Sequence, residues 1–204
     1  MRWLITAIIV LATGLANAQA SMAPAAQQLV EDTAGKIQAR MHEEDARLKN
    51  DPAYIYRLVD EIILPHFDFK RMSGWVLGRN WRTATPEQQE RFTREFRTLL
   101  VRTYSKALVD NRDRKIVYEP LRADPKATDV IVRSEVEQEG SFPIEITYSL
   151  YLNGEGAWKV YDVNIDGISL VANYRTSFTN EIKQSGLDNL IKKLSERNQQ
   201  AANE

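Results

Sequence analysis

Few residues in this chain combine the type and spacing that catalysis requires. The sequence has no cysteine, and it lacks the GxxxxGK(S/T) phosphate-binding loop, the HExxH zinc motif and the GxSxG nucleophile motif. Its two histidines stand apart, because His42 lies among acidic residues and His66 follows Pro65. Neither has a clustered partner that would define a metal site or a general base, so an ordinary polar role is the alternative for both.

One carboxylate remains as a catalytic candidate. Asp162 shares one face of a predicted strand with Asn164. A carboxylate in an apolar cone is the general base of some small α+β isomerases. The competing interpretation places both side chains on a solvated outer face.

A basic cluster is the second feature that could bind something. Lys70, Arg71, Arg79 and Arg82 flank bulky apolar residues, and they suit anionic head groups or an acidic partner surface, although charged runs are usually solvated faces. Elsewhere basic and acidic residues are mixed, and the formal net charge is −1. We therefore expect no nucleic acid as a partner, because such proteins concentrate basic residues on one face.

The N-terminal residues have the pattern of a secretory signal peptide. Arg2 supplies a positive charge, residues 3–15 form an apolar run too short to span a bilayer, and Ala16-Asn17-Ala18 matches an AxA cleavage site. We expect cleavage after Ala18 and a soluble exported protein. Without cysteines it must be stable without disulfides. We expect a single domain over residues 19–197 and a frayed polar tail over residues 198–204.

The first half of the chain has the apolar periodicity of helices. We expect one helix over residues 23–49, a second from Tyr54 to Ile63, and a short third helix capped by Asp68. Thr85-Pro86-Glu87-Gln88 combines a capping box with proline at the first helical position, so a long helix should follow it.

After Lys115 the apolar period becomes two, which is typical of strands with one buried face. We expect four antiparallel strands, over residues 115–121, 130–137, 144–152 and 158–166, and then two helices. Helices followed by strands predict an α+β domain in which helices cover one face of a curved antiparallel sheet. The bulky apolar residues that meet between these layers either fill the space or line a pocket, and periodicity alone does not decide between them.

Two long segments carry a resemblance to a known family. Residues 76–108, VLGRNWRTATPEQQERFTREFRTLLVRTYSKAL, and residues 156–178, GAWKVYDVNIDGISLVANYRTSF, resemble the MlaC family of periplasmic phospholipid-binding proteins, also called toluene-tolerance Ttg2 proteins. The resemblance extends from about Gln27 to Leu194. The N-terminal helix and the polar tail resemble the family only in the general character of their residues.

The resemblance implies an NTF2-like sheet wrapped by helices around a deep apolar pocket for the acyl chains of a glycerophospholipid. It implies a periplasmic carrier without cofactor or catalytic activity, which maintains the lipid asymmetry of the outer membrane. Its partners would be an MlaA–porin complex at the outer membrane and an ATP-driven transporter containing MlaD at the inner membrane. An isomerase or hydratase using the same apolar cone, and a periplasmic adaptor or chaperone with a solid core, are the alternatives.

We select candidate lipid-binding residues from the apolar faces of these elements. From the helices before the sheet we select Met72, Val76, Leu77, Phe92, Phe96, Leu99 and Leu100. From the sheet we select Ile146, Tyr148, Leu150, Val160 and Val163. Val160 and Val163 have opposite parity, so both point inward only if a bulge separates them. Near the mouth we select Ile168, Val171 and Tyr174, with Asn173 and Arg175 at the rim, where a structural cap or an ion pair is the alternative to a phosphate contact.

Overall fold

The computed structural model describes residues 22–200, so the predicted signal peptide lies outside the described part. The helices are α1 (Met22–Glu43), α2 (Asp45–Asn50), α3 (Tyr54–Ile62), the 3-10 helix η1 (Leu64–His66), α4 (Phe69–Leu77), α5 (Arg79–Thr83), α6 (Pro86–Asp110), α7 (Leu170–Ser185) and α8 (Leu187–Gln200). The strands are β1 (Ile116–Tyr118), β2 (Asp129–Val136), β3 (Ile144–Leu152), β4 (Trp158–Ile165) and β5 (Ile168–Ser169). The predicted α+β class is confirmed.

Local capping signals begin two of the helices as expected. Thr85 and Gln88 exchange hydrogen bonds, in which Gln88 N donates to Thr85 Oγ1 at 3.2 Å and Thr85 N donates to Gln88 Oε1 at 3.0 Å. At the start of α4, Arg71 N donates to Asp68 Oδ1 at 2.9 Å. These bonds satisfy backbone donors that have no partner within the helix.

Two predicted helix ends differ from the structure by more than one residue. The helix expected over residues 23–49 is interrupted at Glu44, and the bend turns α2 so that Leu48 packs with Met41 and Tyr54. At the other end, α8 continues to Gln200. Asn198, which we placed in a frayed tail, is buried, and its Nδ2 donates to the backbone oxygen of Glu95 at 3.0 Å.

The strands form one antiparallel sheet in chain order, β1-β2-β3-β4-β5. Pairing between β3 and β4 shifts register, because Ser149 pairs with Asp162 whereas Leu150 pairs with Val160. Tyr161 is therefore an extra residue in β4, which is a β-bulge. In a regular strand Val160 and Val163 would point to opposite faces. Because of the extra residue they point to the same face, and both are buried.

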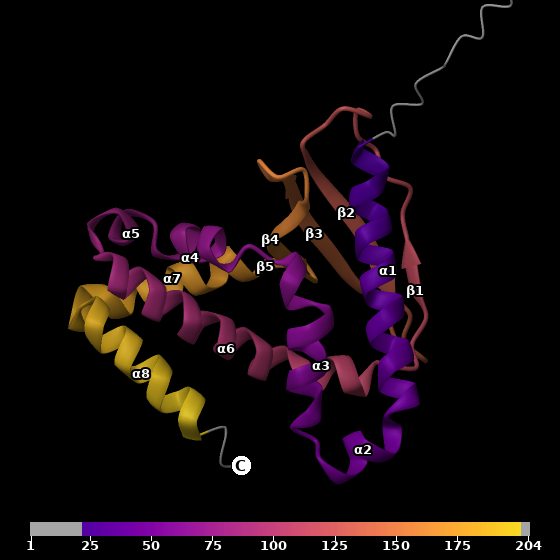
Figure 1. The fold of residues 1–204 in the computed structure, drawn as a ribbon, viewed down its shortest axis with the longest axis horizontal. Helices are drawn as coiled ribbons and strands as arrows, with labels where there is room; N and C mark the ends of the chain where they lie inside the picture. The colour runs from indigo at the N-terminus through magenta and orange to yellow at the C-terminus, as the bar shows by residue number, and fades with distance from the viewer. Residues whose placement is uncertain (1–21, 201–204) are drawn as a thin grey trace, which may run out of the picture.

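The helices form two groups at opposite ends of α6 (Figure 1). Helices α4, α5, α7 and α8 gather around its first half, whereas α1 and α3 lie near its second half and in front of the sheet. The apolar core is divided in a related way. A larger cluster joins α4, α6, α7, α8 and the first half of α1 to the sheet, and a smaller cluster joins the second half of α1 to α2, α3 and the second half of α6.

Candidate functional site

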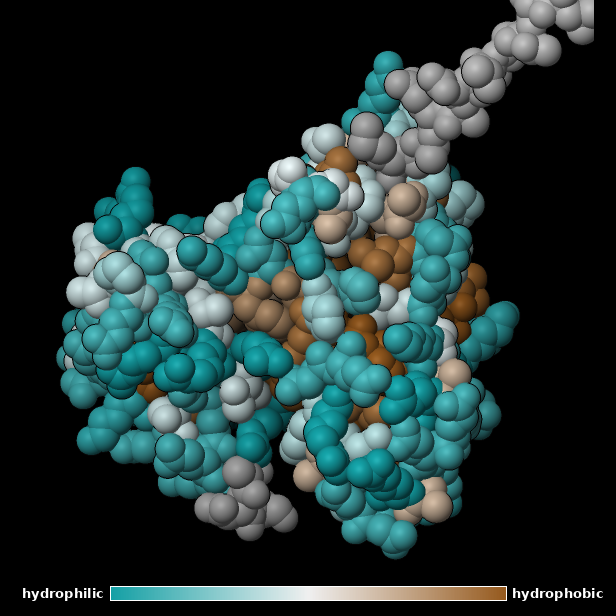
Figure 2. Space-filling model, in the orientation of Figure 1, coloured by the Kyte–Doolittle hydropathy of each residue, from teal (hydrophilic) through white to brown (hydrophobic). Residues whose placement is uncertain are grey.

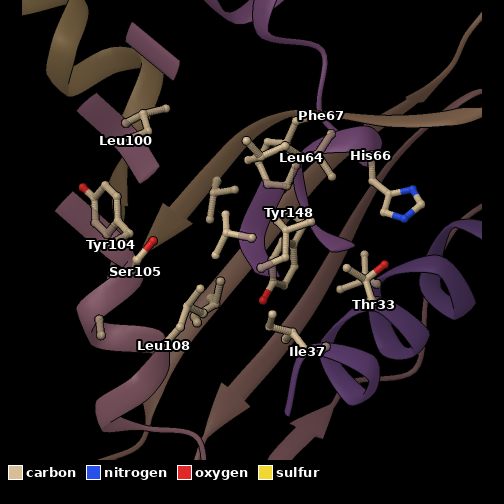
Figure 3. Close-up of a pocket in the computed structure, with 18 of the residues that line it drawn as sticks. Thr33, Ile37, Leu64, His66, Phe67, Leu100, Tyr104, Ser105, Leu108 and Tyr148 are labelled. Carbon is tan, nitrogen blue, oxygen red and sulfur yellow. The ribbon is translucent and has the colours of Figure 1, made fainter. Parts of the chain in front are cut away.

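A cavity of about 320 Å³ lies between the two apolar clusters. Leu100, Tyr104 and Leu108 enter it from α6, and Thr33 and Ile37 face them from α1 (Figure 3). Leu64 and Phe67, from the segment after α3, lie above the ring of Tyr148, which projects from the sheet between the helices, and His66 lies to one side, above Thr33 (Figure 3).

The walls of the cavity are mostly hydrocarbon. Besides the residues above, the apolar lining includes Leu29, Val30, Met41, Val59, Ile63, Phe69, Val101, Ile116, Val136, Ile144, Ile146, Val160, Val163, Ile165 and Leu170. In the space-filling view, apolar residues reach the surface in the middle of one face, between hydrophilic flanks (Figure 2). A concave, predominantly apolar site of this volume is of the kind that holds an apolar ligand.

Most polar groups of the lining are already bonded within the protein. Gln38 Nε2 donates to the backbone oxygens of Arg112 and Arg114, at 3.2 and 3.0 Å, which fastens α1 to the segment after α6. Ser105 Oγ donates to Val101 O at 2.6 Å, and Arg112 Nη2 lies 2.8 Å from Asp45 Oδ1. Few donors therefore remain to bind a polar ligand inside the cavity.

The tyrosines of the cavity remain neutral. Burial, reinforced by the neighbouring Tyr174, raises the pKa of Tyr104 to about 12. Burial also raises the pKa of Tyr148, although a hydrogen bond with Ser134 acts in the opposite direction. The side chain of Tyr148 lines the cavity and keeps some accessible surface there. Neither phenol can act as a base near neutral pH.

One titratable group of the cavity wall lies near two lysines. His66 lines the cavity, and its pKa is lowered first by burial and then by the positive charges of Lys159 and Lys36. Lys159 Nζ donates to Pro65 O at 2.7 Å, so its charge is held beside η1. Two positive charges therefore lie near this end of the cavity.

Five of the predicted lipid-binding residues line the cavity. They are Leu100, Ile146, Tyr148, Val160 and Val163. The four sheet residues share a face because of the bulge at Tyr161. Their role toward a ligand stays a prediction.

Most of the other selected residues lie in the larger apolar cluster and not in the cavity wall. They are Met72, Val76, Leu77, Phe92, Phe96, Leu99, Leu150 and Val171. Phe92 and Phe96 stack with ring centroids 5.7 Å apart, and Phe178 packs edge-on against Phe92 at 5.8 Å. Because α4, α7 and α8 close around the first half of α6, its apolar face is filled by neighbours there.

The other four of the five residues selected near the mouth and rim also lie outside the cavity wall. Tyr174 packs against Phe96 with centroids 5.3 Å apart, and Ile168 is 58% exposed in the turn before α7. Asn173 and Arg175 are exposed on α7. A Cβ atom on Gly78 would lie 3.3 Å from Arg175 Nη2, so this guanidinium covers the end of α4 and not the cavity.

Sequence reasoning missed the helical wall opposite the sheet. It overlooked α1, α3 and η1 as lining elements, as well as the second half of α6. Signals for them were present. Thr33 and Ile37 continue an apolar stripe of the first helix, and Tyr104 and Leu108 extend the stripe that contains Leu100 at intervals of one helical turn.

The catalytic candidates have structural roles. Asp162 Oδ2 accepts a hydrogen bond from Ser169 Oγ at 2.6 Å, and its Oδ1 accepts one from Val171 N at 3.1 Å. It thus supports the start of α7. His42 Nε2 lies 3.4 Å from Asp113 Oδ1 at the surface. Within residues 22–200 no group of three or more His, Cys, Asp or Glu side chains is arranged to hold a metal ion, and no helix is long and apolar enough to cross a bilayer.

The fold and the cavity define a class of protein: an α+β domain in which helices and an antiparallel sheet enclose an apolar site. Comparison with known families is more specific. The model of the family described as "MlaC protein" matches residues 31–196. The chain belongs to the MlaC family.

Individual relatives agree with this assignment. The chain is 24% identical over 196 residues to the intermembrane phospholipid transport system binding protein MlaC of Haemophilus influenzae, covering 95% of this chain and 89% of the relative. It is 26% identical over 162 residues to toluene tolerance protein ttg2D of Pseudomonas putida, covering 78% and 74%.

A solved structure is also similar. It is a phospholipid-binding protein from Ralstonia solanacearum in complex with a phospholipid, with a TM-score of 0.79 and 37% sequence identity. The match covers 87% of this chain and 98% of that protein.

Proposed function

We propose that this protein is a carrier of glycerophospholipid, which holds acyl chains in the cavity between α1, α6 and the sheet. The observation that carries the proposal is the hydrocarbon lining of that cavity. The phospholipid in the similar Ralstonia protein, and the transport system named for the Haemophilus relative, support the same ligand class.

The energetics of transfer explain why a carrier needs such a site. Each buried methylene contributes roughly 0.8 kcal/mol, so two acyl chains represent on the order of 20 kcal/mol that would be lost in water. The cavity need not bind more tightly than a bilayer, because both offer hydrocarbon surroundings. When the lipid has nearly the same free energy in the cavity and in the membrane, the carrier can release it at its destination.

We further propose that the carrier works in the periplasm and exchanges lipid with an MlaA–porin complex at the outer membrane and an MlaD-containing transporter at the inner membrane. The signal-peptide pattern of residues 1–18 and the name of the Haemophilus relative support this location and role. The chain itself would need no catalytic group, since the ATP-driven step belongs to the partner.

The lipid phosphate would remain at the end of the cavity near His66. Lys36 and Lys159 provide positive charge there, and neither forms an ion pair within the described residues. This assignment replaces Asn173 and Arg175 as rim candidates, because those residues lie away from the cavity.

Native mass spectrometry of protein purified from cells without detergent, followed by solvent extraction, tests the proposal. Ile146 faces the cavity from β3, whereas Ile131 is 44% exposed on the opposite face of the sheet. We expect Ile146→Asp to lose a stoichiometric phospholipid and Ile131→Asp to retain it, with both variants folded by circular dichroism. Absence of phospholipid from the unaltered protein, or its full retention by Ile146→Asp, would contradict a carrier that uses this cavity.

A further inference from the structure

A group of basic residues on α4, α5 and α7 has no acidic partner. It consists of Lys70, Arg71, Arg79, Arg82 and Arg175, and we call it the basic group. Within residues 22–200, ion pairs involve cations of α1, α2, α3, α6, the segment after α6 and α8, but none of α4, α5 or α7. The formal net charge of the chain is −1, so this unpaired positive charge is a local feature.

The guanidinium of Arg71 is held in place by aromatic rings. Its Cζ atom lies 3.9 Å from the ring centroid of Tyr151, 5.1 Å from that of Tyr161 and 5.4 Å from that of Trp75. Trp75 and Tyr161 pack edge to face at 4.8 Å. Such a cation loses little conformational entropy when it binds an anion.

The carboxylate of Asp68 forms no ion pair with the guanidinium of Arg71. Asp68 accepts hydrogen bonds from the Arg71 backbone N and from the Tyr151 hydroxyl. The Nε atom of Arg71 is buried and has no hydrogen-bond acceptor. A buried donor without a partner is unfavourable, so the guanidinium of Arg71 keeps hydrogen-bonding capacity that the described chain does not satisfy.

Three members of the basic group line a surface hollow of about 470 Å³. Lys70, Arg71 and Arg82 supply its positive charge, Asp68 adds one carboxylate, and Trp75, Trp81 and Tyr151 supply aromatic walls. Gly74 and Gly78 line it without side chains, and Arg175 lies against Gly78. Arginine, tryptophan and tyrosine are the residues that most often dominate binding energy at protein interfaces.

The hollow is separate from the proposed lipid site but shares a chain segment with it. Phe67 and Phe69 line the cavity, whereas Asp68 and Lys70 line the hollow, and the two sites have no lining residue in common. A ligand in the hollow would therefore touch the outer side of a segment whose inner side faces the cavity.

We propose that the hollow binds an acidic segment of a partner protein. Carboxylates of the segment accept hydrogen bonds from Arg71, Lys70 and Arg82, and the rest of the segment packs on Trp75, which is 43% exposed. A membrane contact would require several protruding apolar side chains, and among the residues of the hollow Trp75 is the large apolar one that is exposed.

Fluorescence anisotropy with labelled hexaglutamate tests this inference at about 0.15 M salt, where charges farther apart than about 8 Å are screened. Lys70→Gln/Arg82→Gln removes two exposed cations of the hollow. Arg122→Gln/Lys126→Gln is the matched control, because it removes two exposed cations between β1 and β2 that form no ion pair in the described chain. We expect the first variant to weaken binding about ten-fold or more and the control by less than about two-fold.

Three results would overturn the proposal. The first is that the unaltered protein does not bind hexaglutamate. The second is that both double variants weaken hexaglutamate binding equally. The third is that the Lys70→Gln/Arg82→Gln variant loses binding to phosphatidylglycerol vesicles while its hexaglutamate binding is unchanged. The last result would assign the hollow to a membrane surface. Native mass spectrometry of each variant checks that the lipid cargo is retained, so failure of the hollow is distinguished from failure of the cavity.

Discussion

At the scale of single residues, two kinds of apolar side chain have to be separated. Phe96 has no exposed surface and is packed by Phe92, Tyr174 and Phe178. Ile146 is equally apolar but keeps accessible surface, because it faces the cavity. The first kind stabilises the fold, and the second is available to a ligand.

Truncation should separate these roles. In protein stripped of lipid, we expect Phe96→Ala to lower the free energy of unfolding by about 3–5 kcal/mol, because it opens a void in a filled core. Ile146→Ala should lower it less, since that side chain already borders empty space. Urea denaturation of both variants measures the difference. An equal or larger effect for Ile146→Ala would mean that this position is packed.

His66 provides a pH-dependent test. Its pKa is lowered by burial and by Lys159 and Lys36, so it lies below the value of about 6.5 expected in the unfolded chain. The unfolded state then binds more protons, so the contribution of His66 to stability is complete above about pH 6.5 and decreases as the pH falls toward the folded pKa.

A proton NMR titration of His66 measures this shift. We expect a pKa below that of the urea-unfolded protein, and we expect Lys159→Gln to raise it by removing a nearby positive charge. A folded pKa at or above the unfolded value would contradict the burial of this imidazole.

At the scale of elements, the bulge in β4 determines which side chains face the helices. Tyr161 is the extra residue, and its hydroxyl donates to Asp129 Oδ1 at 3.0 Å. Trp158 and Val160 precede it and Val163 follows it, and all three are buried. Without the extra residue, either Trp158 and Val160 or Val163 would point to the outer face of the sheet.

Deletion of Tyr161 tests the importance of this register. We expect a large loss of stability, because either Trp158 and Val160 or Val163 and Ile165 must leave the inner face. Deletion of Gly140, in the exposed connection between β2 and β3, is the control and should be tolerated. Thermal unfolding followed by circular dichroism compares the two. Equal melting temperatures would show that the register has another determinant.

At the scale of the whole molecule, the cavity lies between the larger and the smaller apolar cluster. Its volume of about 320 Å³ is at the lower end of the range for small-molecule pockets, and a phospholipid with two acyl chains is larger than such molecules. We therefore expect the clusters to separate slightly when lipid enters.

A bound lipid would contact both clusters and should raise the thermal stability of the protein. A ligand that binds only the folded state stabilises it by an amount that grows with ligand concentration relative to Kd, about 2.7 kcal/mol at a hundred-fold excess. We expect the melting temperature to fall when lipid is extracted and to recover when phospholipid is restored. Differential scanning calorimetry measures both steps. An unchanged melting temperature would indicate that the lipid does not bridge the clusters.

The sequence by itself determined the local features of this protein. Apolar periodicity indicated the helices and the strands, and the Thr85 capping box and the Asp68 cap marked two helix starts. The residue pattern of 76–108 and 156–178 indicated the family before any contact was known. These signals are readable because they depend on neighbours within about one helical turn or one strand.

Only the tertiary structure decided which apolar faces are filled and which are open. Phe96 and Leu100 lie one turn apart on α6, yet the first is enclosed by α4, α7 and α8 and the second faces the cavity. The bulge at Tyr161 and the meeting of Arg71 with Tyr151 likewise depend on residues distant in the chain. Apolar periodicity predicts that a side chain is buried. The distance to the opposite helix or strand then determines whether that side chain packs against another one or borders a cavity that can hold a ligand.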